Sequence, residues 1–259
     1  MVIMKKARRL RAYLGIIDSP ILHLRNPYII AFWSVTFPGF GHLLLGKYYR
    51  GFLLVTWEFF INVHSKLNTA MTYSFMGNFE LAKEVLNIRV LHMYIPVYIF
   101  CIWDSYRTTV DLNNEYILAE RENAPIKKMN LKSYGVNYLD RRNPLMAIFW
   151  SLTIPSLGQI YQHRILQGFF TLLWAILIIY FSHFIEATHY LYLGDIKKST
   201  SVLNIQWLMF FPSFYFFTVY DSYMNTVELN KLFKKEQKNY LKNHFQPSDF
   251  KIIKGEKVT

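Results

Sequence analysis

Three acidic residues in apolar stretches are the side chains of this chain best placed to do chemistry. Asp104 and Asp221 each end an apolar run within the same tripeptide, Asp-Ser-Tyr, and Glu58 lies in the middle of another run. A carboxylate beside lipid is costly unless it is paired or hydrated. Each of the three is therefore either a relay for protons or cations, or one half of a buried polar contact.

The two aspartates favour a structural role, because they occupy equivalent places in an internal duplication. Residues 25–113 align with residues 142–230 at a constant offset of 117 without a gap, and 31 of the 89 aligned pairs are identical. A feature that both copies keep is expected to belong to the fold. We therefore expect Asp104 and Asp221 to fix their helix to the glycine turn of their own repeat and to contribute equally to stability.

The expected partners of these aspartates are cations and backbone amides near the turn, because a carboxylate accepts strong hydrogen bonds from both. The candidates are Arg25, Arg142, Lys47, Arg164 and the amides of Gly41 and Gly158. The structural repeat motif that both copies share comprises Asn26, Pro27, Pro38, Gly41, Gly51, Asp104 and Tyr106 in the first copy, and Asn143, Pro144, Pro155, Gly158, Gly168, Asp221 and Tyr223 in the second.

Glu58 is different, because its counterpart in the second copy is Ala175. A lone acid within a membrane segment is a candidate for transport or another function. The structural alternatives are a shallow position or a carboxyl group held neutral by burial.

Other kinds of site find no support in the residue pattern. The eight histidines show no metal-binding spacing, and the sequence has no phosphate-binding loop, nucleophile elbow or paired-carboxylate motif. The single cysteine, Cys101, excludes an internal disulfide and is interpreted as a small buried hydrophobic residue. The sequence thus predicts no catalytic, cofactor-binding or metal-binding residues.

Composition and charge-free runs indicate an all-α integral membrane protein. The chain has 259 residues, is 53% hydrophobic and 18% aromatic, and carries a formal net charge of +12. Runs without charge, such as Gly168–Ile185, match the hydrocarbon thickness of a bilayer. Each repeat has three apolar segments, at 27–46, 51–71 and 88–106 in the first and at 144–161, 168–188 and 205–223 in the second.

The first segment of each repeat is predicted to begin as a helix and then to bend. Asn26 and Asn143 are favourable N-cap residues, and each precedes a proline in the first helical position. The breakers at 38–41 and 155–158 interrupt the helix, because proline removes a hydrogen bond and glycine permits a positive φ. We expect a re-entrant or interfacial helical hairpin here, followed by two transmembrane helices.

The distribution of Lys and Arg predicts the topology. Basic residues are concentrated in the N-terminal region 1–24, the polar linker 114–141 and the tail 231–259, which flank the membrane repeats 25–113 and 142–230. Under the positive-inside rule, parallel repeats place both termini and the linker in the cytoplasm. The alternative is an inverted arrangement, in which all three segments of each repeat span and the linker lies opposite the termini.

The turns and the closing aspartates together resemble the TM2-domain superfamily. The stretches concerned are Pro38–Gly51 and Pro155–Gly168, with the aspartate near the end of the last helix of each repeat. The resemblance implies a double-TM2 bacterial membrane protein, and it implies a fold more than a function. The pattern departs from the superfamily at Leu45-Gly46 and Gln162-His163, where its aromatic-glycine step should stand.

These observations predict a non-enzymatic multi-pass protein of a bacterial cytoplasmic membrane, acting as a scaffold or assembly partner. The alternative is a small-solute or ion transporter or channel, with a path between the two repeats near Glu58. A scaffold requires a dry interface between the repeats, whereas a transporter requires a polar cavity that reaches the middle of the membrane. The expected partners are the lipid bilayer, anionic lipid headgroups, and another membrane protein or a second copy, and the basic tail is assigned to lipid rather than to nucleic acid.

Overall fold

The computed structural model describes residues 7–133 and 135–246 and is mostly helical. The helices of the first repeat are α1 (Pro27–Thr36), α2 (Phe40–Leu44), α3 (Tyr48–Ser65), α4 (Leu67–Phe75), α5 (Phe79–Val85) and α6 (Ile88–Arg121). Those of the second are α7 (Pro144–Thr153), α8 (Leu157–Tyr161), α9 (Ile165–Phe181), α10 (Phe184–Tyr192), α11 (Ile196–Val202), α12 (Ile205–Leu208) and α13 (Phe210–Phe245). Every helix of the first series begins 117 residues before a helix of the second, and α12 with α13 corresponds to α6.

Short strands lie outside the repeats. Strand β1 (Ala12–Tyr13) pairs in parallel with β2 (Ile126–Lys127), and β3 (Met129–Lys132) pairs antiparallel with β4 (Gly135–Tyr138). The regions expected to be separate from the membrane repeats are only partly so. Helix α6 continues into the linker as far as Arg121, and α13 continues into the basic tail as far as Phe245.

The helix starts are confirmed. The side chains of Asn26 and Asn143 accept hydrogen bonds from the amides of Tyr28 and Leu145, both at 2.9 Å, and a proline follows each cap. The predicted breaks are also present, since α1 and α7 end just before Pro38 and Pro155. The positive φ falls on the residue after each proline, Gly39 with φ of 97° or Ser156 with φ of 91°, rather than on Gly41 or Gly158.

The segments 51–71 and 168–188, each expected to be a full span, are not single continuous helices. Both segments break within the apolar run, at Lys66 and at His183, and both of these residues have a φ of 54°. Among the described residues, no single helix has both the length and the apolar character needed to cross a bilayer. Three bent pairs meet those criteria together: α5 with α6, α9 with α10, and α11 with α12–α13, bent by 90°, 56° and 83°.

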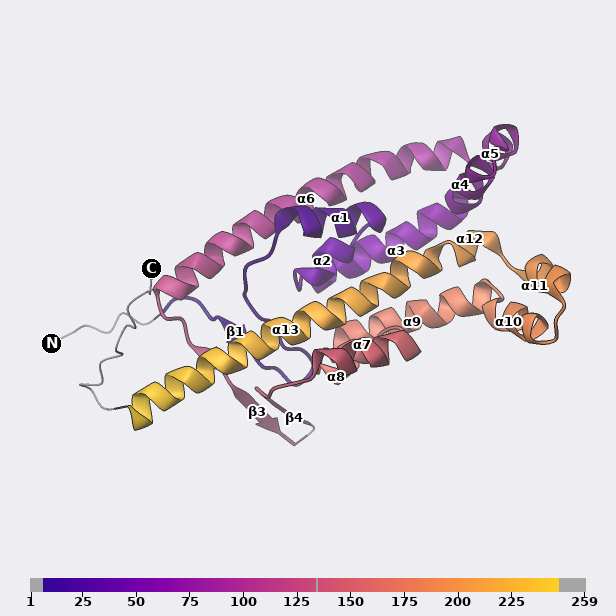
Figure 1. Ribbon diagram of the computed structural model, residues 1–259. Coiled ribbons are helices and arrows are strands. Elements are labelled where there is room, and N and C mark those ends of the chain that lie inside the picture. The colour runs from indigo at the N-terminus through magenta and orange to yellow at the C-terminus, as the bar shows by residue number, and fades with distance from the viewer. Residues whose placement is uncertain (1–6, 134, 247–259) are drawn as a thin grey trace, which may run out of the picture.

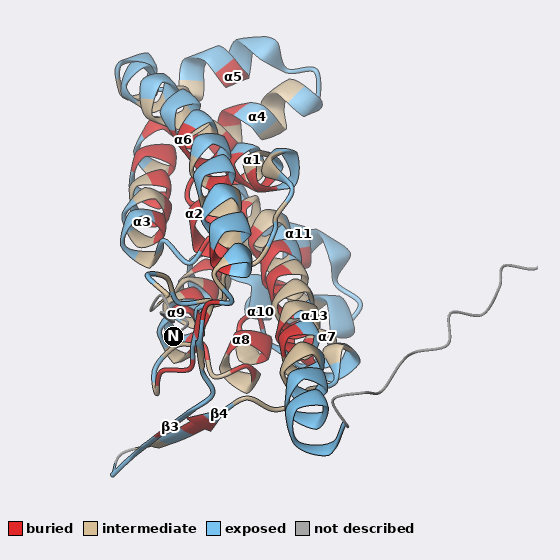
Figure 2. Cartoon of the chain, turned by 90° about the vertical axis from the view of Figure 1, so that its left-hand side faces the viewer, coloured by how far each residue is buried: buried red, intermediate tan, exposed pale blue. Residues whose placement is uncertain are grey.

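The two repeats meet in an aromatic core. Figure 2 shows buried residues on the inward faces of the helices and exposed residues on the outer faces. Phe59 of α3 stacks on Trp174 of α9 at 3.8 Å between ring centroids, and Phe40 of α2 stacks on Phe217 of α13 at 3.9 Å. Phe37 and Phe214 close the same cluster. Aromatic pairs of this kind bury large areas and add directional contacts, so they hold the two repeats together.

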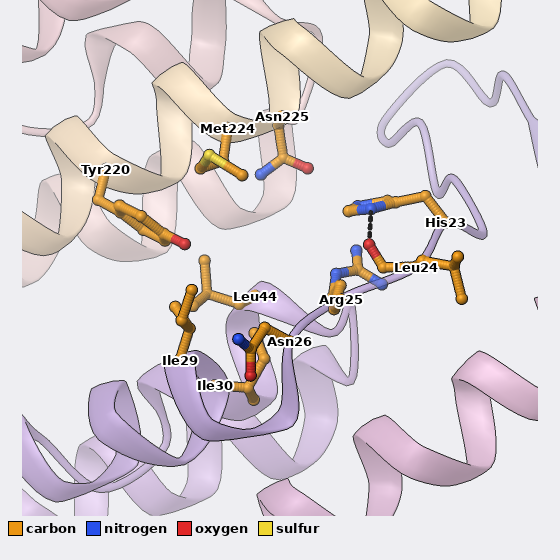
Figure 3. A pocket seen from close by; sticks show the side chains of 10 residues that line it. All are labelled: His23, Leu24, Arg25, Asn26, Ile29, Ile30, Leu44, Tyr220, Met224 and Asn225. Atoms are coloured by element: carbon orange, nitrogen blue, oxygen red, sulfur yellow. Dashed lines mark hydrogen bonds between the residues drawn. The ribbon is translucent and has the colours of Figure 1, made fainter.

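The strands and the helical loops lie at opposite ends of the molecule. Figure 1 places β1, β3, β4 and the C-terminal ends of α6 and α13 at one end, with α4, α5, α10 and α11 at the other. A cavity of about 160 Å³ lies between α1 and α13 (Figure 3). The N-terminal segment, the linker and both returning helices therefore share one end of the fold.

Candidate functional site

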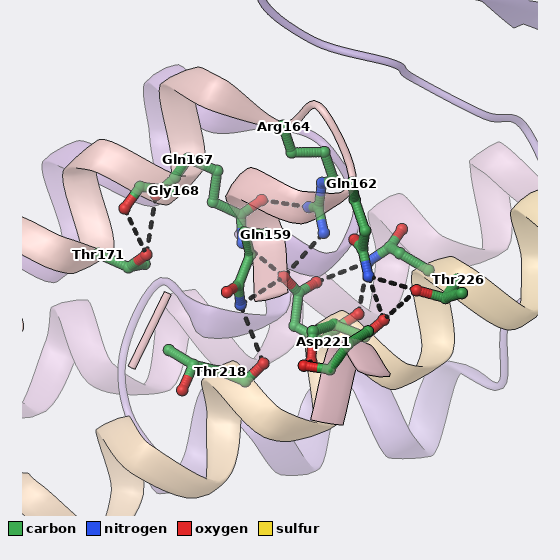
Figure 4. A network of polar contacts seen from close by, with 12 residues as sticks. Gln159, Gln162, Arg164, Gln167, Gly168, Thr171, Thr218, Asp221 and Thr226 are labelled. Atoms are coloured by element: carbon green, nitrogen blue, oxygen red, sulfur yellow. Dashed lines mark hydrogen bonds and ion pairs between the residues drawn. The ribbon is translucent and has the colours of Figure 1, made fainter. Parts of the chain in front are cut away.

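Asp221 is the centre of a buried polar cluster between α8, α9 and α13 (Figure 4). Its Oδ2 accepts hydrogen bonds from Arg164 Nη1 at 2.7 Å, Gln167 Nε2 at 3.0 Å and Gln159 Nε2 at 3.1 Å. Its Oδ1 accepts from Asn225 Nδ2 at 2.7 Å. Both oxygens are thus satisfied by donors from three helices and from the residue preceding α9, so the carboxylate joins α13 to the turn.

Arg164 is the counter-charge of Asp221. Burial alone would lower the pKa of the Arg164 guanidinium, but the charge of Asp221 and its hydrogen bond raise that pKa above its ordinary value. Arg164 Nε also donates to the Tyr48 hydroxyl at 3.4 Å, and that hydroxyl donates to Asp18 Oδ1 at 3.0 Å. The cluster therefore reaches the first repeat and the N-terminal segment.

Asp104 lies in a smaller cluster. Its Oδ2 contacts His42 Nε2 of α2 at 2.9 Å and accepts from Arg50 Nη1 of α3 at 2.9 Å. The Asp104 side chain is only 9% exposed, but the Arg50 side chain is 59% exposed. This ion pair faces an open hollow, whereas the pair of Arg164 with Asp221 is sealed.

The expected tether between each aspartate and its own turn is present, but most of the expected partners are wrong. Among the candidate cations, only Arg164 binds one of these two aspartates, since Arg50 rather than Lys47 binds Asp104 and Arg142 pairs with Asp140. The amides of Gly41 and Gly158 do not bind the carboxylates, because the donors are side chains of the turn and the following helix. Substitution between the copies, such as His42 for Gln159, hid these donors from the repeat comparison.

Gly41 and Gly158 instead permit a close helix crossing. A Cβ on Gly41 would lie 2.2 Å from Ser34 Oγ and 3.1 Å from Ser105 Cβ. A Cβ on Gly158 would lie 2.1 Å from Ser151 Oγ and 2.7 Å from Ser222 Cβ. Small residues at such a crossing let backbones approach closely. The glycine and the serines thus set the distance at which the aspartate meets its turn.

Cys101, His42 and Asp104 follow one another in the order that nucleophilic catalysis uses. Cys101 Sγ lies 3.9 Å from His42 Nδ1, and His42 Nε2 contacts Asp104. A nucleophile must meet a substrate, yet Cys101 and His42 have no exposed surface, and Cys101 accepts a hydrogen bond from the Gly39 amide at 3.2 Å. The corresponding residues of the second repeat, Thr218 and Gln159, lack a thiol and an imidazole. The arrangement fits internal packing rather than covalent chemistry.

Glu58 belongs to a polar network that joins the repeats. Its Oε1 accepts from Asn62 Nδ2 at 2.9 Å, and the same amide donates to Asn68 Oδ1 at 3.1 Å. Asn68 Nδ2 donates to the Gln206 carbonyl at 3.0 Å, and Gln206 Nε2 donates to Asn62 Oδ1 at 2.9 Å. Glu58 itself is 3% exposed. Sequence reasoning identified the acid but not its amide partners, whose counterparts Ile179 and Ile185 are apolar.

The other motif residues serve packing. Gly51 and Gly168 leave room for Leu43 and Ile160, whose side-chain carbons would lie 2.4 Å and 2.6 Å from an added Cβ. Tyr106 lies edge-on to Tyr28 with 5.5 Å between ring centroids. Tyr223 is 40% exposed. Neither tyrosine has a hydrogen bond to the aspartate clusters.

Two further equivalent contacts were missed by sequence reasoning. Asn113 binds both backbone polar groups of Arg25, at 2.9 and 2.8 Å, and Asn230 binds those of Arg142 at 2.9 and 2.7 Å. The Tyr98 hydroxyl donates to the Val35 carbonyl, and the Tyr215 hydroxyl donates to the Leu152 carbonyl. The arginines, asparagines and tyrosines of these contacts are identical in both copies, so the repeat comparison could have identified them.

No group of three or more His, Cys, Asp and Glu residues that could hold a metal ion occurs in residues 7–133 and 135–246. No protein-family model, no curated protein and no solved structure matches the chain. The resemblance to the TM2-domain superfamily therefore stays a prediction.

Proposed function

We propose that the protein is a non-enzymatic, multi-pass scaffold or assembly partner of a bacterial cytoplasmic membrane, built from two parallel repeats of the TM2 type. The observation that carries the proposal is the aromatic core between the repeats. Phe40, Phe59, Phe214 and Phe217 are each no more than 2% exposed. A dry, stacked interface of this kind suits a rigid body and disfavours a solute path along it.

Apolar residues on the outer surface support a membrane environment. Leu166, Phe169, Leu173, Ile176 and Tyr180 recur at helical spacing on α9, and all five are exposed. A contiguous apolar stripe of this kind is typical of contact with lipid or with another membrane protein. Three bent helix pairs together meet the length and composition requirements for crossing a bilayer.

The arrangement of the ends supports the parallel topology. The basic N-terminal segment, the linker strands and the returning ends of α6 and α13 gather at one end of the molecule. Ion pairs join them there, for example Arg11 with Glu120 at 2.6 Å and Lys128 with Glu236 at 2.7 Å. Under the positive-inside rule this end lies in the cytoplasm.

One observation favours the alternative, a small-solute or ion transporter or channel. The network of Glu58, Asn62, Asn68 and Gln206 places a carboxyl group and amides on the boundary between the repeats. Its polar groups bind one another across that boundary, so we assign it to specifying how the repeats pair.

Two measurements separate these functions. In liposomes that contain the purified protein, a scaffold produces no proton, sodium or potassium flux above that of protein-free liposomes. A flux that Glu58→Gln abolishes would replace the scaffold by a transporter.

The scaffold itself is tested with a photo-crosslinking amino acid at Phe169 or Ile176 in intact membranes. We expect a discrete protein adduct from these exposed positions and none from the neighbouring Phe170, which is partly buried and stacks on Phe52 at 4.0 Å. Adducts to lipid alone from Phe169 and Ile176 would contradict the scaffold.

A further inference from the structure

The cavity between α1 and α13 contains an arginine that lacks the partner of its counterpart in the second repeat. Its walls include Arg25 and His23 from the N-terminal segment, Ile29 and Leu44 from the first repeat, and Tyr220 and Met224 from α13 (Figure 3). The volume is about 160 Å³. Apart from Arg25, His23 and two asparagine amides, the lining is largely apolar, so the site combines a cation with an apolar surface.

In the second repeat the equivalent arginine has a carboxylate, a carbonyl and an aromatic ring as internal partners. Arg142 Nε donates to Asp140 Oδ1 at 2.9 Å, and Arg142 Nη1 donates to the Tyr161 carbonyl at 2.8 Å. The Arg142 guanidinium also lies over the Tyr161 ring, 5.9 Å from its centroid. At the same offset of 117, His23 stands for Asp140 and Leu44 stands for Tyr161.

Arg25 therefore lacks both the carboxylate and the aromatic ring. Only its backbone groups are bound, by Asn113, and no ion pair or hydrogen bond of its guanidinium is found within residues 7–133 and 135–246. The two acids whose charge acts on Arg25 already have partners. Asp221 pairs with Arg164 at 2.7 Å, and Glu228 pairs with Lys231 at 2.6 Å and lies 3.6 Å from His23 Nδ1. Burial first, and then the charge of Arg164, lower the pKa of Arg25 to about 10, which is the direction expected for a cation without a full counter-charge.

His23 does not supply the missing charge. Burial and the charge of Arg25 lower the pKa of His23 to about 3, so the imidazole is neutral at physiological pH. Its Nδ1 lies 3.1 Å from the Leu24 carbonyl (Figure 3). A neutral ring next to Arg25 leaves the cavity with a net positive charge and room for an anion.

We propose that this cavity binds the anionic headgroup of a membrane lipid, with the lipid phosphate on the Arg25 guanidinium and the start of the acyl region against Ile29, Leu44 and Met224. Guanidinium and phosphate form strong charge-assisted, often bidentate hydrogen bonds. The external phosphate takes the place that the Asp140 carboxylate holds in the second repeat. The cavity is lined in part by the basic N-terminal segment, which the proposed topology places on the cytoplasmic side, where anionic headgroups accumulate. The inference rests on the proposed membrane function, which supplies the lipid.

The test uses His23→Asp, which gives the first repeat the carboxylate that the second has. The dissociation constants of wild-type protein for phosphatidylglycerol, phosphatidylcholine and inorganic phosphate are measured in neutral detergent by native mass spectrometry and by the shift of the melting temperature. Phosphatidylglycerol should bind wild-type protein most tightly. Both His23→Asp and Arg25→Gln should weaken it at least about tenfold, the loss expected for a charge-assisted contact. His23→Asp should also melt at a higher temperature than wild type in the absence of lipid.

The matched control is Arg142→Gln, which breaks the internal pair of the second repeat. It should lower the melting temperature but change the phosphatidylglycerol affinity less than about twofold, since its partners are internal. If Arg25→Gln does not fold, His23→Asp still tests the site, because it keeps Arg25 and gives its guanidinium an internal counter-charge that competes with the lipid phosphate. Undiminished binding of phosphatidylglycerol to His23→Asp would overturn the site.

The remaining outcomes separate the sources of the anion. Inorganic phosphate that binds as tightly as phosphatidylglycerol, and that both variants weaken, would overturn the assignment to lipid in favour of a free anion. Equal binding of phosphatidylcholine would overturn the requirement for net negative charge. Failure of the proposed function gives a different result: wild-type protein would then be recovered from cells without detergent, whatever its lipid affinity.

Discussion

At the scale of single residues, both aspartates bind the turn of their own repeat, but they differ in burial and in the number of their partners. Asp221 has no exposed surface and four donors, one of which is a guanidinium that is 5% exposed. Asp104 has two partners, and its cation is largely exposed to solvent. Removing one partner of a buried ion pair strands the other charge, whereas an exposed pair contributes little. The equal contributions expected from the duplication therefore do not follow from the geometry.

We predict that Asp221→Asn destabilises the protein more than Asp104→Asn. The expected losses are about 3–5 kcal/mol for Asp221→Asn and about 1–3 kcal/mol for Asp104→Asn. Thermal unfolding in detergent measures both. Asp111→Asn is the control, because Asp111 lies in an exposed contact with Arg107 at 3.9 Å and should cost less than about 0.5 kcal/mol. Equal losses for the two variants would show that the Arg164 charge finds another partner.

A second prediction at this scale concerns the pH dependence contributed by His23. Its pKa is about 3 in the folded protein and about 6.5 in the unfolded chain, so the unfolded state binds the extra proton first. The His23 contribution is fully present above about pH 6.5 and is lost as the pH falls from there towards 3. Between pH 7 and pH 5, wild type should lose about 2 kcal/mol more than His23→Gln. Denaturant unfolding of both proteins at both pH values measures this difference. Identical losses for wild type and His23→Gln would show that the His23 imidazole is solvated in the folded protein.

At the scale of helices, α1, α2 and α6 can cross at a short distance because Gly41 has no Cβ. Gly41 lies where a Cβ would meet Ser34 Oγ at 2.2 Å and the Ile30 carbonyl at 2.7 Å. The Ile30 contact involves backbone, which cannot rotate away. The same geometry recurs at Gly158, where the carbonyl belongs to Ala147. The glycine turn is therefore a packing device, and its backbone amides are not the anchor for the carboxylate.

We predict that Gly41→Ala and Gly158→Ala each cost about 1–3 kcal/mol, because overpacking displaces the helices. Adding Ser34→Ala to Gly41→Ala should restore only part of the loss, since the Ile30 carbonyl still clashes. Leu53→Ala on the exposed face of α3 serves as control and should change stability little. Melting temperatures in detergent report all four variants, and wild-type stability of Gly41→Ala would contradict the close crossing.

At the scale of the whole molecule, the two copies are joined by contacts that the duplication does not explain. The aromatic core, the Glu58 network and the pairing of β1 with β2 each connect parts far apart in sequence. The first repeat contributes Asn62 and Asn68 to the network, and the second contributes Gln206. Residues that differ between the two copies thus form this contact between them.

We predict from this arrangement that Asn123→Cys and Thr259→Cys are labelled from the cytoplasmic side and Tyr192→Cys from the opposite side. Asn123 follows the C-terminal end of α6, which lies at the strand end, whereas Tyr192, 87% exposed, ends α10 at the other end (Figure 1). Thr259 lies outside the described residues. Impermeant thiol reagents on intact cells and on inverted vesicles give the sides. The native Cys101 has no exposed surface and should stay unlabelled, so it provides the background. Labelling of Asn123 and Thr259 from opposite sides would restore the inverted arrangement.

The sequence alone determined the features that depend on local physics. The duplication, the caps at Asn26 and Asn143, and the breaks at Pro38 and Pro155 follow from side chains that act on their own backbone within a few residues. A repeated aspartate also predicted a tether within each repeat, since both copies needed it.

Only the tertiary structure decided what depends on neighbours distant in sequence. No glycine or proline adjoins the breaks at Lys66 and His183, so the sequence gives no local signal for them. They occur where the Ser65 and Ser182 carbonyls accept from the Asn87 and Asn204 amides, at 3.0 and 3.1 Å. The donors to Asp104 and Asp221, the amides around Glu58 and the unpaired state of Arg25 likewise arise from contacts between elements. Residue types limit which of these contacts are possible, and the packing of the two repeats selects among them.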